Sequence, residues 1–323
     1  MSNLSPLLQA FRRHPAVQHI LQHLDGSSPA PPLRLKGLMG AQESFVLASV
    51  AQLRPAVPLH LFVATHKDEA AYRRDDLEGL LGHEAAYFFP DSFKRPAYFE
   101  DLHPTQMLQR SEVVSKITGH GETLAAAAVV TYPEALFEKV VRPDILNKSR
   151  IEVQKGQRLD VDFIIEVLLE YGFERTDFVY EPGQFSIRGG IVDLFSYGND
   201  LPYRIELFDD EVEAIRLFDP LTQLSERNIA HVSIVPNLNT RFRQDQKTSL
   251  LHMLPPGTVV WVKDWQLLLD RLQVCFERAE VFASKLTALD SAELRDIFRD
   301  RAFLYPGEVQ EALQERSVIH LGG

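Results

Sequence analysis

The sequence has almost no cysteine and no long apolar run, and each absence excludes a class of protein. Cys275 is the single cysteine among 323 residues, so no disulfide can form within the chain, and a reducing compartment, the cytoplasm, is expected. No run approaches the roughly 18 apolar residues of a membrane-spanning helix. No membrane partner is therefore expected. The first 24 residues carry Arg and His throughout, which predicts an amphipathic helix rather than a secretory signal.

Basic residues are also scarce. The chain has 34 Lys and Arg against 45 Asp and Glu, a net charge of −11, and no dense basic run. Because nucleic-acid binding needs Lys and Arg concentrated on one face, this balance favours protein partners over DNA. A hydrophobic content of 45% is typical of globular domains. The last residues, ERSVIHLGG, form no closing amphipathic helix, which predicts that the sequence continues in a longer protein.

Apolar strands and helices alternate between residues 33 and 140. Candidate strands lie at 33–38, 59–65, 85–89 and 125–132. Candidate helices lie at 41–53, 66–82 and 105–120, and a further one begins at Pro133. Because apolar strands separated by helices pair in parallel and are covered on both faces, this part predicts a parallel-sheet lobe.

A different pattern begins near residue 140. An amphipathic helix is expected at 160–173, with Asp160 as its N-cap and Gly172 just beyond its end. Its apolar stripe is Val161, Ile164, Ile165, Leu168 and Leu169. Short alternating strands follow at 176–182, 184–188, 190–196, 203–208, 211–218 and 231–235. These elements predict a small α+β domain with an antiparallel sheet over 140–236, between segments 1–139 and 237–323, the latter with its best strand at 258–264.

One loop has the outline of a phosphate-binding loop without its chemistry. The stretch GLMGAQES runs from Gly37 to Ser44, between a candidate strand and a candidate helix. In the pattern G-x-x-x-x-G-K-[ST], backbone N–H groups and a Lys hold the phosphates, and the hydroxyl binds Mg²⁺. When the stretch is aligned on Gly40, Gln42 stands at the position of the pattern's second Gly and Glu43 at the position of its Lys. A carboxylate at the Lys position repels a triphosphate. The alternative interpretation is an ordinary strand–turn–helix.

The stretch FERTDFVYEPGQFSIRGGIVDLF, residues 173–195, carries the most information about function. Its alternation places Phe185, Ile187, Val192 and Leu194 on the core side of a sheet. The opposite side then receives Ser186, Arg188, Asp193 and Phe195. An outward Phe beside an Arg is typical of interface hot spots.

The structural alternative for the same residues stays open. Phe195 would close an edge of the core, and Arg188 would pair with Glu206 or Asp193 across strands. The acidic FDDE of 208–211 is interpreted as a hairpin turn with solvated carboxylates rather than a metal site.

A family resemblance now emerges. The G-x-F-x-x-R-G-G core, the hairpin RIELFDDE and the turn FDPLTQ together resemble the UvrA-interacting domain shared by the bacterial repair protein UvrB and the transcription-repair coupling factor Mfd. The stretch VQKGQRL at 153–159 is closer to Mfd. The resemblance implies UvrB-like domains 1a (1–139), 2 (140–236) and 1b (237–323), that is, a degenerate P-loop, helicase-like α/β lobe with an inserted α+β domain.

The resemblance also implies a role. The chain would be the non-catalytic N-terminal part of a transcription-repair coupling factor, recruiting UvrA to stalled transcription complexes for nucleotide excision repair. Arg175, Arg188 and Phe195 match family positions that contact UvrA, and the expected UvrA-binding site also includes Ser186 and Asp193. A family Arg is replaced by Ser186, which removes one contact expected from the family pattern. In UvrB a long aromatic hairpin inserts into DNA, whereas Pro90 to Leu124 here predicts only loop and helix.

Cofactors and other partners follow from the same resemblance. ATP, Mg²⁺, DNA and RNA polymerase would be bound by a motor and domains outside this sequence, and the C-terminal domains of the full-length chain would mask the UvrA-binding face. No cofactor or metal is expected in this part. Two rivals remain: a UvrB-type ATP-dependent damage-recognition enzyme, which predicts nucleotide binding, and a DNA-binding module, which predicts salt-sensitive affinity for duplex DNA.

Overall fold

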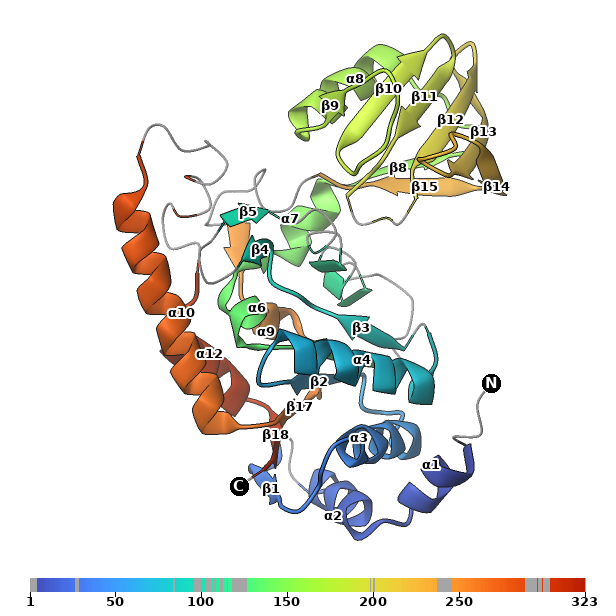
Figure 1. Ribbon diagram of the computed structural model, residues 1–323. Helices are drawn as coiled ribbons and strands as arrows, with labels where there is room; N and C mark the ends of the chain where they lie inside the picture. The colour runs from blue at the N-terminus through green and yellow to red at the C-terminus, as the bar shows by residue number, and fades with distance from the viewer. Residues whose placement is uncertain are drawn as a thin grey trace. The chain divides into compact units, whose positions relative to one another are not determined.

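The protein divides into two compact units in the computed structural model (Figure 1). One unit, here called the parallel-sheet unit, comprises residues 1–139 and 248–323, and the other, the mixed-sheet unit, comprises 140–247. The structure describes residues 5–322 except 27–28, 84, 96–99, 103–105, 107–108, 111–112, 115, 118–126, 198, 200, 237–245, 288–294, 296–297 and 299–302. The mixed-sheet unit is therefore inserted within the sequence of the parallel-sheet unit.

A six-stranded parallel sheet forms the centre of the first unit, and it combines the four strands expected within 1–139 with two strands from 248–323. Its strands lie in the order β1 (Leu33–Leu35), β18 (Ser317–Leu321), β17 (Val259–Val262), β2 (Leu59–Val63), β6 (Ala127–Thr131) and β3 (Ala86–Phe88). Every neighbouring pair is parallel. All residues of β2, β6 and β17 are buried, because helices cover a parallel sheet on both faces.

The helices of this unit follow the sequence pattern with one correction. The expected single helix at the N-terminus is two helices, α1 (Ser5–Phe11) and α2 (Pro15–Leu24). The break occurs at Pro15, because proline is accommodated in the first turn of a helix and not in its interior. The other helices are α3 (Gln42–Leu53), α4 (Lys67–Leu81), α6 (Pro133–Phe137), α9 (Leu250–Met253), α10 (Trp265–Lys285) and α12 (Pro306–Gln314).

Cys275 packs on the buried face of α10 and is a free thiol of the core. Burial raises its pKa to about 12, so the thiol is protonated and unreactive near neutral pH. Among the described residues, no helix is long and apolar enough to cross a bilayer.

The segment that the sequence describes as loop and helix contains a short antiparallel ladder. Strands β4 (Phe93–Arg95) and β5 (Glu100–Leu102) pair there, which corrects the expectation. The helix expected at 105–120 lies largely outside the described residues.

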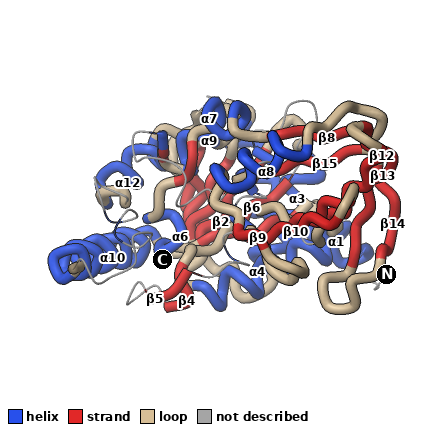
Figure 2. Tube along the Cα trace, turned by 90° about the horizontal axis from the view of Figure 1, so that it is seen from above, coloured by secondary structure: helices blue, strands red, loops and turns tan. Residues whose placement is uncertain are grey.

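The mixed-sheet unit contains a six-stranded sheet in the order β14, β13, β12, β11, β10, β9 (Figure 1), and Figure 2 draws the strands in red. Its strands are β9 (Glu174–Arg175), β10 (Gln184–Arg188), β11 (Ile191–Leu194), β12 (Tyr203–Phe208), β13 (Glu211–Phe218) and β14 (Ser225–Ile229). Strands β8 (Ile151–Gln154) and β15 (His231–Ile234) form a separate antiparallel pair. The remaining elements are β7 (Val140–Val141), α7 (Pro143–Lys148) and α8 (Val161–Glu170), while β16 (Lys247–Thr248) spans the boundary between the two units in the sequence.

Helix α8 begins and ends where the sequence predicts. The Asp160 carboxylate accepts hydrogen bonds from the N–H groups of Asp162, at 2.9 Å, and Phe163, at 3.3 Å. Gly172 follows the C-cap with a left-handed φ of 81°. Ile164 and Leu168 enter the core. Leu169, expected in the apolar stripe, is exposed instead.

Three further expectations about this sheet need correction. Residues 176–182 form an irregular loop rather than a strand. Strand β14 was not predicted from the sequence. The sheet is also not purely antiparallel, since β9 pairs with β10 in parallel. The acidic 208–211 stretch is the expected hairpin turn between β12 and β13, and its residues are exposed.

Candidate functional site

One face of the mixed sheet packs on the core, and the other carries the polar residues that the sequence singles out. Phe185, Val192 and Leu194 lie in the core with α8, as the alternation predicts. On the opposite face a cross-strand row runs through Ser186 (β10), Asp193 (β11), Arg204 (β12) and Arg216 (β13), each aligned with the next.

The centre of this face is a buried carboxylate between two guanidinium groups. Asp193 is only 1% exposed. Arg188 Nη2 donates to Asp193 Oδ2 at 2.7 Å, and Arg204 donates through Nε and Nη2 at 2.8 and 2.9 Å. The hydrogen bonds to Asp193 raise the pKa of Arg204. A carboxylate with three charge-assisted hydrogen bonds fixes both Arg side chains in place.

Arg188 is held by Asp193 but still reaches solvent, with 44% of its side chain exposed. Its guanidinium lies 5.0 Å from the centroid of the Phe178 ring. Phe178 and Tyr180 are themselves about half exposed. The pairing of Arg188 with Asp193, one of the two alternatives left open by the sequence, is confirmed.

The structure does not bring Arg175 onto this face. Its register partner in β9–β10 is Phe185 rather than Ser186, and partners in register share a side of the sheet. Arg175 therefore lies at the exposed edge, on the core side. Its side chain makes no hydrogen bond or ion pair with the other described residues.

Three of the expected contact residues are buried, namely Asp193, Ser186 and Phe195. Ser186 is enclosed, and its hydroxyl donates to the Asp177 carbonyl at 3.0 Å. Phe195 is 5% exposed and packs with Val179 and Phe218 in a small cluster. Phe195 lies on the predicted side of the sheet, but the expectation of an outward ring is wrong because the 176–182 loop contributes Val179 over it.

Sequence reasoning missed Arg204 and the apolar side chains around the face. Gln223 Nε2 donates to the Val179 carbonyl at 3.0 Å and joins the 176–182 loop to the 219–224 turn. The large exposed apolar side chains of these two segments are Phe178, Tyr180, Leu221 and Leu224. The sequence offered one indication of these side chains, the alternation of Phe178, Val179 and Tyr180, in which the first and third residues are exposed and the second is buried.

The second candidate region is the loop between β1 and α3. Gly37 and Gly40 have left-handed φ values of 86° and 56°, as a tight strand-to-helix loop requires. The Met39 N–H donates to the Gln42 side-chain oxygen at 3.0 Å. Gln42 therefore uses, within the chain, a loop N–H of the kind that would otherwise bind a phosphate.

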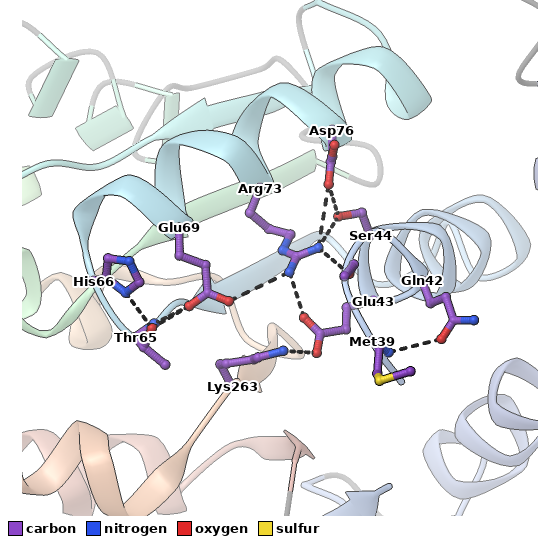
Figure 3. Close-up of polar contacts among 11 residues, drawn as sticks. Met39, Gln42, Glu43, Ser44, Thr65, His66, Glu69, Arg73, Asp76 and Lys263 are labelled. Carbon is purple, nitrogen blue, oxygen red and sulfur yellow. Dashed lines mark hydrogen bonds and ion pairs between the residues drawn. The ribbon is translucent and has the colours of Figure 1, made fainter. Parts of the chain in front are cut away.

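Glu43 is fully buried between two cations (Figure 3). Its carboxylate accepts from Arg73 Nη2 at 2.8 Å and from the Lys263 ammonium. Arg73 Nη1 also donates to the Gly40 carbonyl at 2.7 Å and to Ser44 Oγ at 3.1 Å. The Ser44 hydroxyl donates to Asp76 at 3.0 Å.

Neighbouring carboxylates complete the charge balance. Glu69 lies 3.7 Å from Arg73 and accepts from the N–H and hydroxyl of Thr65. Burial raises the pKa of Glu69, but the Thr65 hydrogen bonds and the charges of Lys263 and Arg73 outweigh it and lower the pKa overall. Among the described residues, no group of three or more His, Cys, Asp or Glu is arranged to hold a metal ion.

Comparisons with known proteins find one matching family and several similar relatives. Residues 151–239 match the UvrB interaction domain family. The transcription-repair-coupling factor of Bacillus subtilis is 30% identical over 71% of this chain and 19% of its own length. That of Myxococcus xanthus is 30% identical over 63% of the chain and 17% of its own length. The UvrABC system protein B of Vibrio vulnificus is 28% identical over 68% of the chain and 34% of its own length.

The fold and the match over 151–239 define a protein that carries a UvrB interaction domain. The chain is a UvrB-homology module of the type found in transcription-repair-coupling factors. It spans about a fifth of the length of those relatives.

Proposed function

We propose that the mixed-sheet unit is a docking domain for UvrA and that the exposed part of Arg188 is its central contact. The supporting observation is that Asp193 holds Arg188 in one position beside the half-exposed Phe178. The match of this unit to the UvrB interaction domain family supports UvrA as the partner.

The geometry suits recognition of an acidic surface. An Arg that is already fixed by Asp193 loses less side-chain entropy on binding than a free one. Its remaining N–H groups can donate to a carboxylate of the partner. Phe178 and Tyr180 supply apolar area next to the charge, as in interface hot spots.

Calorimetric titration of the chain with purified UvrA, without nucleotide, tests this proposal. Arg188→Ala is expected to weaken binding about 30-fold, which corresponds to about 2 kcal/mol. Arg158→Ala is the matched control, because Arg158 is an exposed Arg of the same unit, in a surface ion pair with Asp210. Absent binding, or equal losses in the two variants, would contradict the proposal.

Two further variants define the extent of the interface. Arg175→Ala weakens binding only if UvrA wraps around the β9 edge. Phe195→Ala is expected to lower the melting temperature of the unit, because the buried ring packs on Val179 and Phe218. A loss of UvrA affinity at unchanged stability would instead make Phe195 a direct contact.

We infer a wider role on the same basis. The module would recruit UvrA to stalled transcription complexes as part of a coupling factor. Its other domains would bind ATP, DNA and RNA polymerase and would mask the UvrA-binding face until it is needed. A binding assay with and without the rest of the coupling factor measures that masking.

The parallel-sheet unit is, in this proposal, a scaffold that binds no nucleotide. Glu43 stands at the loop position of the phosphate-binding Lys and is already paired with Arg73, and the Gln42 side chain already accepts from a loop N–H. Equilibrium binding of a fluorescent ATP analogue should therefore show no saturation. Saturable, Mg²⁺-dependent binding would favour the UvrB-type enzyme.

A further inference from the structure

The ion pairs of Glu43 carry an inference about how the parallel-sheet unit is stabilised. Glu43 is the second residue of α3, directly after the β1–α3 loop. Lys263 directly follows β17, which is separated from β1 by β18 alone. The two side chains thus come from residues 220 positions apart and meet at the carboxyl end of the sheet, where open α/β sheets bind their ligands.

P-loop nucleotide hydrolases also place an ammonium group and a carboxylate at their phosphate site, but with the two charges at exchanged positions. Their loop supplies a Lys to the phosphates, and an Asp elsewhere holds Mg²⁺ with the loop hydroxyl. Here the loop position carries the carboxylate of Glu43, and the strand end carries the ammonium of Lys263. A nucleotide with its Mg²⁺ does not match these charges, since each would meet a like charge.

We infer that Glu43 and Lys263 are a charge-exchanged pair that replaces the contacts of a bound nucleotide and metal ion with an internal ion pair. The pair joins the start of α3 to the end of β17, which a ligand would otherwise bridge. Arg73 extends the bridge to α4 through Glu43, Ser44 and the Gly40 carbonyl.

Burial makes this pair more than a surface contact. Glu43 is fully enclosed and Lys263 is 26% exposed, so removing either partner leaves a poorly solvated charge. Removing both leaves no unpaired charge between the two positions, and Arg73, which also loses Glu43, keeps its ion pairs with Glu69 and Asp76. The two residues should therefore be strongly coupled, and reversing both signs should be tolerated better than reversing one.

A double-mutant cycle on thermal unfolding of the whole chain tests the inference. Glu43→Gln and Lys263→Gln should each lower the melting temperature, and the double variant should lower it by at least about 5 °C less than the sum of the two. The exchange variant E43K/K263E should melt above E43K alone. Asp25→Asn and Arg54→Gln, which remove a more exposed ion pair of the same unit, are the control cycle and should be nearly additive.

The outcomes separate the inference from a merely structural role of either residue. Additive losses at Glu43 and Lys263, or an exchange variant no more stable than E43K, would overturn it. If Glu43→Gln does not fold, a folded exchange variant still supports the pair and an unfolded one contradicts it. Magnesium pyrophosphate should not raise the melting temperature of the native chain, and a clear rise would show that the site is open to ligand.

Discussion

Replacing Asp193 by Ala should destabilise the mixed-sheet unit strongly. The change removes a carboxylate that is 1% exposed and accepts three hydrogen bonds from two Arg side chains. Arg204 would remain largely buried, with 15% of its side chain exposed, and would lose its charged partner. Arg188 would lose the contact that fixes its position.

The magnitude follows from the burial of each group. Breaking a buried ion pair costs about 3–5 kcal/mol, and water can replace the partner of the half-exposed Arg188, so about 3 kcal/mol is expected. The unit spans residues 140–247, which is 247 − 140 + 1 = 108 residues. An unfolding entropy of about 0.23 kcal/mol/K for that size converts the loss to about 13 °C in melting temperature.

Thermal unfolding followed by circular dichroism measures this loss. Asp210→Ala is the control, because Asp210 is an exposed carboxylate in a 3.6 Å surface pair with Arg158, and its effect should stay within about 0.5 kcal/mol. A loss below about 1 kcal/mol for Asp193→Ala would refute the reasoning that Asp193 organises the face.

Three further predictions concern the fold. Gly190→Ala should destabilise by about 1–3 kcal/mol in urea titrations, since an added Cβ would lie 2.7 Å from the Leu207 carbonyl oxygen; an unchanged midpoint would contradict it. Asp160→Ala should cost about 1 kcal/mol through the lost N-cap of α8, measured in the same way. Burial lowers the pKa of His60 to about 3, so only the unfolded chain binds this proton between pH 6.5 and 3. The free energy of unfolding should therefore decrease as the pH is lowered through this range, by up to about 1.4 kcal/mol per pH unit. Urea titrations at pH 7 and 4.5 measure this decrease, which should be smaller in His60→Gln.

Local pattern was sufficient for the buried central strands of the parallel sheet and for the ends of α8. The apolar runs of β2, β6 and β17 predict buried parallel strands, and Asp160 and Gly172 mark the boundaries of α8. Leu169 was wrongly predicted to be buried, because the apolar stripe of α8 is wider than the face of the helix that packs on the sheet.

The site was harder to predict because its residues meet through non-local packing. Alternation placed Phe195 on the correct side of the sheet, but its burial depends on Val179 and Phe218 from two other segments. The substitution at Glu43 was visible in the loop, whereas its partner Lys263 lies 220 residues away. Arg204 could be assigned to Asp193 only once the β11–β12 register was known.

Hydrogen–deuterium exchange of the chain with and without saturating UvrA tests the docking face most directly. The account predicts slower exchange over residues 176–188, which include the Phe178 loop and β10, and unchanged exchange over 37–44 in the parallel-sheet unit. Unchanged exchange over 176–188 in the UvrA complex, with protection elsewhere, would contradict the proposal that this face binds UvrA.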